Sequence, residues 1–180
     1  MRKIMAGLAM SLDGVVERPS EWMRFGDEAH EMMAAGLAAA DTVLLGRRTY
    51  LEFARMWPTM PDSVPMARFL NGSPKYVVSS EPINLTWADS TRIDLDGVAE
   101  LKARPGKNIL IPGSPRLVAS LLRLGLLDEL AVMIPPVVVG GGQRLFEDGY
   151  GRLDLEVVDS RILAGGILAA TYSRGSGNMD

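Results

Sequence analysis

The chain has 180 residues, of which 47% are hydrophobic and 23% charged, so it is a folded globular protein rather than a disordered or fibrous one. Its net charge of -3 argues against nucleic-acid binding, and no apolar run reaches the roughly 20 residues that a membrane span needs. Without cysteines and with one histidine, disulfides, thiolate catalysis and cysteine-ligated zinc are excluded, and no metal is expected.

The first part of the chain alternates apolar runs with helical patterns. Residues 3–10 form an apolar run typical of a buried strand, and turn-forming Asp13-Gly14 follows it. A helix is predicted to begin at Asp27, which can cap it, and to end before the strand "TVLLG" at 42–46. A second helix is predicted from about Arg48 to Met56, because the residue before a proline avoids helical geometry.

The middle of the chain continues this alternation. After a proline-rich loop, "KYVVSS" at 75–80 is predicted to be a strand, and a short helix is predicted to begin at Asp94 or Asp96. The next strand, "NILIPGS" at 108–114, ends in a glycine turn. Ser114 as the cap and Pro115 as the first helical residue then predict the start of another helix.

The last third of the chain is mostly strand. Four apolar segments are predicted to be strands: 129–134, 136–139, 153–163 and 166–173. The last two are predicted to form a hairpin across 164–166. The order of elements predicts an α/β fold, a three-layer sandwich with a mixed, mainly parallel central sheet that ends in an antiparallel hairpin. We expect a single domain over 1–174, a disordered tail over 175–180, and a cytoplasmic location with no membrane or nucleic-acid partner.

Three turns that follow apolar strands are suited to anionic groups. They are Gly46-Arg47-Arg48-Thr49, Ser79-Ser80 and Gly113-Ser114-Pro115-Arg116. Ligands of open α/β sheets bind beyond the carboxyl ends of the strands, where helix N-termini offer free N–H groups. Each turn alone is more readily structural than functional. Together they predict a dinucleotide, with its pyrophosphate across the two helix starts and a further phosphate near the arginines and the serine pair.

The same segments resemble a known superfamily. "VLLGRRTYLEF" resembles the Gly-Arg-x-Thr segment of dihydrofolate reductases, and "AGLAMSLDG" resembles the first strand and loop of that superfamily. "KYVVSS", "IPGSPRLVASLLRLGLLDEL" and "PPVVVGGGQRLF" are more similar to the C-terminal reductase domain of bifunctional riboflavin-biosynthesis proteins and its free-standing bacterial relatives. The resemblance spans nearly the whole chain. It implies a dihydrofolate-reductase-like fold that binds NADPH and transfers hydride to a pterin-like or pyrimidine-like ring.

The resemblance also implies which residues bind the cofactor. They comprise the backbone that receives the nicotinamide amide, the loop beside the nicotinamide ribose, and the turns that hold the phosphates. In that order they are Ala6 and Gly7; Asp13 and Gly14; Gly46, Arg47, Arg48 and Thr49; Ser79 and Ser80 for the 2′-phosphate; and Gly113, Ser114, Pro115, Arg116 and Leu117 for the pyrophosphate.

Candidate catalytic residues are few. Folate reductases carry a pterin-binding carboxylate on the first helix, and its equivalent by spacing from Gly46 falls near His30, with Asp27 and Glu31 close by. Folate is therefore not the favoured substrate. His30 is a candidate proton donor or a histidine with only a structural role on the helix. Asp13 either orients substrate and relays a proton or forms an ordinary Asp-Gly turn.

Two further segments are candidates for binding substrate. Trp57 either stacks on a flat heterocycle or closes the core, and Gly140, Gly141 and Gly142 either approach a ligand or form a flexible connection. A homodimer is predicted, because the apolar segments 129–134 and 135–141 offer more hydrophobic surface than one small sandwich needs.

The predicted function is an NADPH-dependent reductase of a small heterocycle, most like the 5-amino-6-(5-phosphoribosylamino)uracil reductase of riboflavin biosynthesis. The fused deaminase domain of the bifunctional proteins has zinc chemistry that requires cysteines, and this chain has none. The alternatives are a dihydrofolate-reductase-type activity, or an NADPH-binding protein without efficient catalysis.

Overall fold

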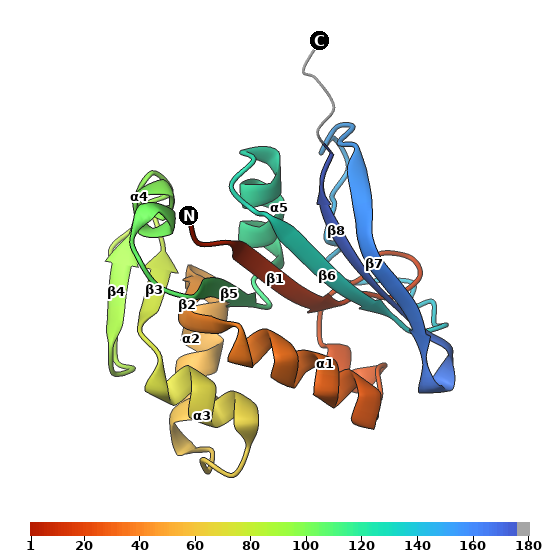
Figure 1. The fold of residues 1–180 in the computed structure, drawn as a ribbon, viewed down its shortest axis with the longest axis horizontal. Coiled ribbons are helices and arrows are strands. Elements are labelled where there is room, and N and C mark those ends of the chain that lie inside the picture. The colour runs from red at the N-terminus through yellow and green to blue at the C-terminus, as the bar shows by residue number, and fades with distance from the viewer. Residues whose placement is uncertain (176–180) are drawn as a thin grey trace.

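An eight-stranded sheet forms the centre of the structure, a computed structural model that describes residues 1–175 (Figure 1). The strands lie in the order β4-β3-β2-β5-β1-β6-β8-β7. Their bounds are β1 Ile4–Ala9, β2 Ala40–Gly46, β3 Lys75–Val78, β4 Ser90–Ile93, β5 Asn108–Pro112, β6 Glu129–Ile134, β7 Leu155–Leu163 and β8 Ile167–Arg174. The helices are α1 Asp27–Ala38, α2 Arg47–Met56, α3 Pro65–Gly72, α4 Gly97–Ala103 and α5 Pro115–Arg123, and the 3-10 turns are η1 Pro19–Glu21, η2 Trp57–Thr59 and η3 Ala164–Gly166. Apart from Gly175, the predicted tail lies outside the described residues.

Six strands of the sheet are parallel and two are antiparallel. Strands β1 to β6 pair in parallel, whereas β8 pairs antiparallel with β6 and β7 antiparallel with β8. The predicted α/β sandwich with a mixed, mainly parallel sheet and a final antiparallel hairpin is confirmed. Because the six strands are parallel, their carboxyl ends lie along one edge of the sheet, the carboxyl edge, and their starts lie along the opposite amino edge.

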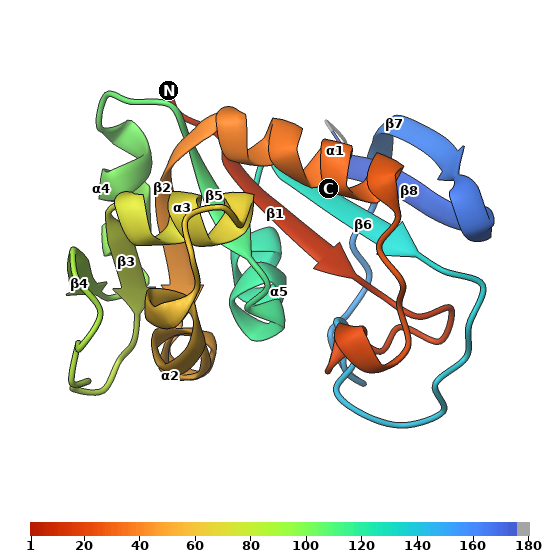
Figure 2. The same cartoon turned by 90° about the horizontal axis from the view of Figure 1, so that it is seen from below.

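The two faces of the sheet are covered differently. Helices α4 and α5 pack on one face, where the largest hydrophobic cluster includes Leu44, Ile109 and Leu121. The other face carries two separate clusters, one between β2, β3, α2 and α3 around Leu45, and one beneath α1 around Ala29. Figure 2 shows α1 and α5 on opposite sides of the sheet. In the strand order, β5 and β1 lie between the strands that contribute buried residues to these two clusters.

The structure differs from the prediction in three segments. The loop predicted between the second helix and residue 75 contains α3, which starts with Pro65 and buries Leu70. Strand β4 was not predicted, because an edge strand of four residues with largely exposed side chains has no apolar run. The predicted strand 136–139 is wrong, since the segment is irregular; it follows prolines that lack the N–H groups a ladder requires.

The helix starts follow the sequence signals with one exception. Gly26, not Asp27, is the cap residue of α1, and Asp27 is the first helical residue, where an acidic side chain still suits the helix dipole. The N–H of Gly97, the first residue of α4, donates to Asp94 Oδ1 at 2.8 Å, so the predicted helix start near Asp94 is confirmed. Within residues 1–175, every helix is too short or too polar to cross a bilayer.

Candidate cofactor and substrate site

Two of the predicted anion-binding turns are hydrogen-bonded to each other. Gly46 ends β2 and its N–H donates to Ser114 Oγ, which follows β5, at 3.0 Å. A Cβ at Gly113 would lie 3.8 Å from Thr49 Cγ2, so the turn after β5 also contacts the first turn of α2. The structure therefore brings the turns at 46–49 and 113–117 together at the carboxyl edge.

The backbone of Ser114 explains how this link forms. Gly113 and Ser114 have φ angles of 87° and 56°, and a left-handed conformation is uncommon for a serine. The expected side-chain cap is absent, because the Ser114 hydroxyl accepts from Gly46 instead of from the first turn of α5. The N–H groups of Arg116 and Leu117 therefore lack a side-chain cap, and such N–H groups at a helix start suit an anion.

The third turn lies on the neighbouring strand. Gly46 pairs with Val78, so Ser79 leaves the sheet beside the start of α2. Ser79 is buried, and its hydroxyl donates to Glu81 O at 2.7 Å, whereas Ser80 is exposed. Arg92 of β4 donates from Nη1 to Ser79 O at 3.1 Å. This arginine is a further cation at the turn, and its position could not be predicted because β4 has no apolar run.

The two arginines after β2 have different surroundings. Arg48 has a side chain 65% exposed, and it pairs with Glu52 at 3.2 Å and with Glu17 at 3.7 Å. Arg47 is exposed and forms no ion pair or side-chain hydrogen bond within residues 1–175. Its guanidinium is therefore free to bind an anion at the start of α2.

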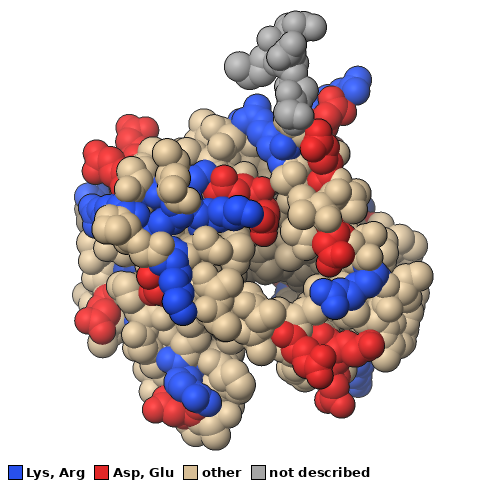
Figure 3. All heavy atoms as spheres, in the orientation of Figure 1, with Lys and Arg blue, Asp and Glu red and all other residues tan. Residues whose placement is uncertain are grey.

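Gly7 leaves the centre of the sheet uncovered. It lies in β1 between β5 and β6, yet it is exposed, and a Cβ built on it would meet no atom within 4 Å. Gly113 N–H donates to Gly7 O at 3.4 Å, so this backbone adjoins the turn after β5. Figure 3 shows that the surface is hollowed near the middle of the view, where β1 and α1 lie in Figure 1. A flat ring therefore has room to lie against β1 here.

Two loops pair with each other next to this open part of β1. We call residues 11–17 and 137–145 the paired loops. Leu12 N–H donates to Val137 O at 2.8 Å, and Val16 N–H donates to Gln143 O at 2.9 Å. Gly14 O accepts from Leu145 N–H at 3.0 Å. The triple glycine at 140–142 is therefore fixed at its ends by pairing with the loop that follows β1.

Asp13 joins the paired loops through its carboxylate. Oδ1 accepts from Ser11 Oγ at 2.7 Å and from Val139 N–H at 3.0 Å, and Oδ2 accepts from Gly140 N–H at 2.9 Å. The hydrogen bond from Ser11 and then those from Val139 and Gly140 lower the pKa of Asp13 to about 2. Asp13 is thus ionised at neutral pH, so it can accept hydrogen bonds but has no proton to donate.

Trp57 lies at the end of α2, and Phe53 lies between it and the turn at 113–117. A Cβ at Gly113 would lie 4.0 Å from Phe53 Cζ, and the rings of Phe53 and Trp57 meet edge to face at 5.8 Å. Trp57 is half-buried, and its Nε1 is buried without a hydrogen-bond partner in the described part of the chain. Its packing against Phe53 fits the core role, and the free Nε1 leaves the substrate role open.

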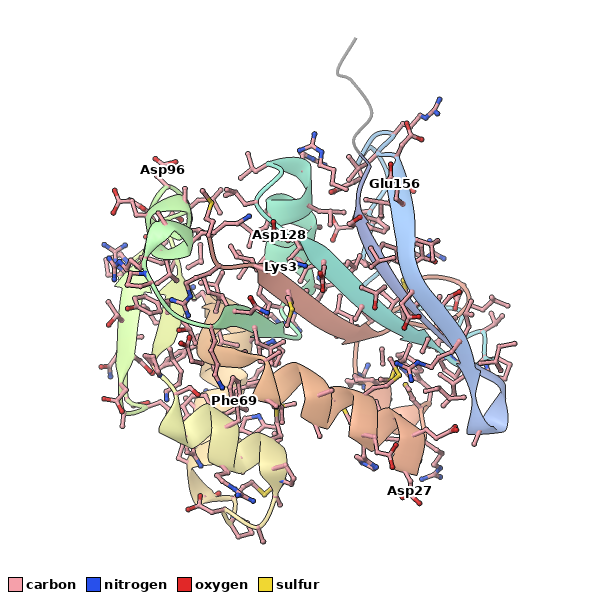
Figure 4. The ribbon with its side chains drawn as sticks, viewed as in Figure 1. Lys3, Asp27, Phe69, Asp96, Asp128 and Glu156 are labelled. Atoms are coloured by element: carbon pink, nitrogen blue, oxygen red, sulfur yellow. The ribbon has the colours of Figure 1, made fainter. Side chains whose placement is uncertain are left out.

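The polar residues of α1 are not gathered at the open part of β1. His30 is exposed, with its ring centroid 6.3 Å from that of Phe25. Asp27 points away from the sheet (Figure 4). Glu28 accepts from Ala164 N–H at 2.6 Å and so attaches α1 to the β7–β8 hairpin. A depression of about 250 Å³ between α1 and β7 is lined partly by Glu28 and Glu31.

Comparison with known proteins gives the family. The RibD C-terminal domain family matches residues 2–169 of the chain. The chain belongs to this family. It is 30% identical over 186 residues to the uncharacterised protein YyaP of Bacillus subtilis strain 168. The aligned region covers 95% of this chain and 94% of that protein.

Two solved structures are similar in fold. One is a diaminohydroxyphosphoribosylaminopyrimidine deaminase/5-amino-6-(5-phosphoribosylamino)uracil reductase from Thermotoga maritima, with a TM-score of 0.67 and 14% identity over 97% of this chain and 57% of that chain. The other is dihydrofolate reductase from Enterococcus faecalis complexed with NADP(H) and RAB-propyl, with a TM-score of 0.63 and 13% identity over 97% of both chains. The fold is therefore dihydrofolate-reductase-like, and the family indicates an oxidoreductase of the riboflavin-biosynthesis reductase type.

Proposed function

We propose that the protein is an NADPH-dependent reductase that transfers hydride to a small heterocycle, most like 5-amino-6-(5-phosphoribosylamino)uracil. The observation that carries this proposal is the exposed Gly7 in the central strand, which adjoins the hydrogen-bonded turns at Gly46 and Ser114. An open backbone beside two helix starts suits a cofactor with a flat ring at one end and phosphates at the other.

Different residues at the carboxyl edge would hold different groups of the cofactor. The turns at 46–49 and 113–117 would hold the pyrophosphate, and Arg47 with Ser79, Ser80 and Arg92 would hold the 2′-phosphate. The backbone of Ala6 and Gly7 would receive the nicotinamide amide, with Asp13 and Gly14 beside its ribose. When bound, NADPH supplies the hydride, and the protein holds the two rings in contact and excludes water.

The substrate would lie against the nicotinamide, between α1 and the paired loops. We propose that the triple glycine at 140–142 approaches the substrate and that Trp57 borders its far end. Asp13, whose pKa is about 2, would orient these loops as a carboxylate, and the proton would come from water or from His30. Dihydrofolate should be a poor substrate, because Asp27 points outward and Glu28 is bonded to the hairpin.

Oxidation of NADPH in the presence of the ribosylamino-pyrimidine tests the proposed reaction. We expect turnover with this compound, little with dihydrofolate, and none in Gly7→Val, whose new side chain fills the open space over β1. Gly72→Val is the matched control, because Gly72 has equal free space but precedes β3 at the amino edge. Tight NADPH binding without oxidation across a panel of pterins and pyrimidines would favour a binding protein instead.

We further propose a cytoplasmic homodimer that pairs through β7. Strand β6, which is the predicted apolar segment 129–134, lies inside the sheet between β1 and β8 and so has no free edge for pairing. Strand β7 is an edge strand and exposes Val157, Val158 and Ile162. Light scattering should give the mass of two chains, and Val158→Asp should give one; a monomeric wild-type protein at micromolar concentration would refute the proposal. Cell fractionation tests the location.

A further inference from the structure

The carboxylate of Glu17 contacts both the segment 137–145 and the first turn of α2. Its Oε2 accepts from Gln143 N–H at 3.2 Å, and its Oε1 lies 3.7 Å from Arg48 Nη2. The backbone of Glu17 is also held, because Trp22 Nε1 donates to Glu17 O at 2.9 Å. The same side chain therefore connects the paired loops to the arginine at the start of α2.

The loop side of this connection is tightly packed. Gly142 has a φ of 121°, and a Cβ built on it would lie 3.1 Å from Val15 Cγ1 and 3.2 Å from Glu17 Oε2. Glycine is required at this backbone angle and this close approach. A shift of the Glu17 carboxylate thus changes the hydrogen bond at Gln143 and the packing of the triple glycine together.

The arginine side of the connection is open to competition. Arg48 is mostly exposed, and both of its partners, Glu17 and Glu52, are carboxylates. A phosphate that binds Arg48 competes with them for the guanidinium, and its negative charge repels a carboxylate a few ångströms away. Of the two carboxylates, Glu17 is the one that belongs to the paired loops and accepts a hydrogen bond from Gln143.

We propose that Glu17 is a positioning residue that couples binding of a cofactor phosphate at Arg48 to the position of the triple-glycine loop. This inference rests on the proposed function, because it assigns the phosphate to the cofactor. Without a phosphate, the Glu17–Arg48 pair holds the paired loops against α2. A phosphate at Arg48 releases Glu17, the hydrogen bond to Gln143 loosens, and the loop becomes free to adjust to substrate.

Hydrogen exchange without any ligand tests the connection itself. Arg48→Gln should speed exchange of the Gln143 amide about threefold, the size expected when one exposed ion pair is lost. Combined with Glu17→Gln, it should add nothing beyond Glu17→Gln alone, because the pair is already broken. Glu52→Gln is the matched control, since it removes the other partner of Arg48 and should leave Gln143 unchanged. An unchanged Gln143 amide in Arg48→Gln would overturn the proposal.

Addition of NADPH then tests the coupling. NADPH should speed exchange of the Gln143 amide in wild type and in Glu52→Gln, but not in Glu17→Gln. Both carboxylate variants should bind NADPH about threefold more tightly, because each loses a competitor for Arg48, so only the loop response separates them. An equal response in Glu17→Gln and wild type would overturn the coupling. If NADPH, NADH and 2′,5′-ADP all fail to bind, the proposed function is wrong, and the ligand-free experiment still decides the role of Glu17.

Discussion

The charged residues at the two edges of the parallel sheet differ in how far other residues of the protein neutralise them. At the amino edge, cations have protein partners: Arg2 pairs with Asp41, Lys3 with Glu129 and Lys102 with Asp128. Figure 4 places Lys3 and Asp128 together beside the starts of β1 and β6. At the carboxyl edge, Arg47 has no such partner among residues 1–175, and Arg48, which pairs with Glu17 and Glu52, is mostly exposed. Charge at the amino edge thus stabilises the fold, whereas charge at the carboxyl edge is available to a ligand.

Charged groups at the amino edge are held by ion pairs and hydrogen bonds within the protein. Burial alone would raise the pKa of Asp41, but hydrogen bonds from Thr42 and Lys107 and the charge of Arg2 lower it below its ordinary value. Lys75 is fully buried, and burial lowers its pKa. Its ammonium donates to Leu70 O at 2.8 Å and to Ser73 O at 2.7 Å, so it caps the end of α3.

The largest effect should come from removing a partner at the amino edge. Asp41→Ala leaves the guanidinium of Arg2, whose side chain is 6% exposed, without its carboxylate. We expect a loss of about 3 kcal/mol in the free energy of unfolding, measured with urea, because an uncompensated buried charge is costly. NADPH affinity should stay unchanged. Asp154→Ala is the control, since its partner Arg152 has a side chain 86% exposed, and the loss there should be below about 0.5 kcal/mol.

For the arginines at the carboxyl edge we expect a loss of NADPH affinity without a loss of stability. Replacing both Arg47 and Arg48 with alanine should weaken NADPH binding by about 2 kcal/mol, roughly thirtyfold, and abolish the preference over NADH, as calorimetry would show. The free energy of unfolding should change by less than about 0.5 kcal/mol, because both side chains are exposed. Equal affinities of the wild-type protein for the two cofactors would contradict the assignment of these arginines.

Ser114 should affect both stability and ligand binding, because its hydroxyl joins two turns of the carboxyl edge. Ser114→Ala leaves the Gly46 N–H without its acceptor and should cost about 1 kcal/mol of stability together with a severalfold loss of NADPH affinity. Ser120→Ala, which removes an exposed hydrogen bond within α5, should alter neither quantity appreciably. A loss of stability with full affinity would show that the link between the turns serves the fold alone.

Whether a feature could be predicted from the sequence depends on how far apart in the chain its interacting residues lie. The mixed sheet, the hairpin and the turns at Gly46 and Gly113 could be predicted, because periodicity and local turn chemistry encode them. The contacts of Asp13 and Glu17 could not, since their partners Gly140 and Gln143 are 127 and 126 residues away. No local pattern distinguishes a carboxylate that binds such a distant N–H from one in an ordinary turn.

Two other differences from the sequence prediction arise from tertiary contacts. Arg92 was missed because "STRI" is a short edge strand without an apolar run, so nothing in the sequence placed its side chain beside Ser79. Ser114 was identified with the wrong partner, because a serine before proline predicts a helix cap, whereas its left-handed backbone turns the hydroxyl to Gly46. In both cases tertiary contacts, not propensity, decided the role of the side chain.

The smallest predicted effect concerns Asp13, a carboxylate at the carboxyl edge whose side-chain hydrogen bonds are all within the paired loops. Its pKa of about 2 lies below the ordinary value of 3.8, because Ser11 and the N–H groups of Val139 and Gly140 stabilise the ionised form. A lowered folded-state pKa means that the stabilisation is complete above pH 3.8 and is lost as the pH falls through about 2. We therefore expect the Val139 and Gly140 amides to exchange faster, relative to the intrinsic rate, as the pH falls from about 4 to 2. Asp13→Asn should remove this pH dependence and loosen the loops at neutral pH, whereas Asp154→Asn should not. If the two amides stay protected at pH 2 in the wild-type protein, the carboxylate of Asp13 is not what holds the paired loops together.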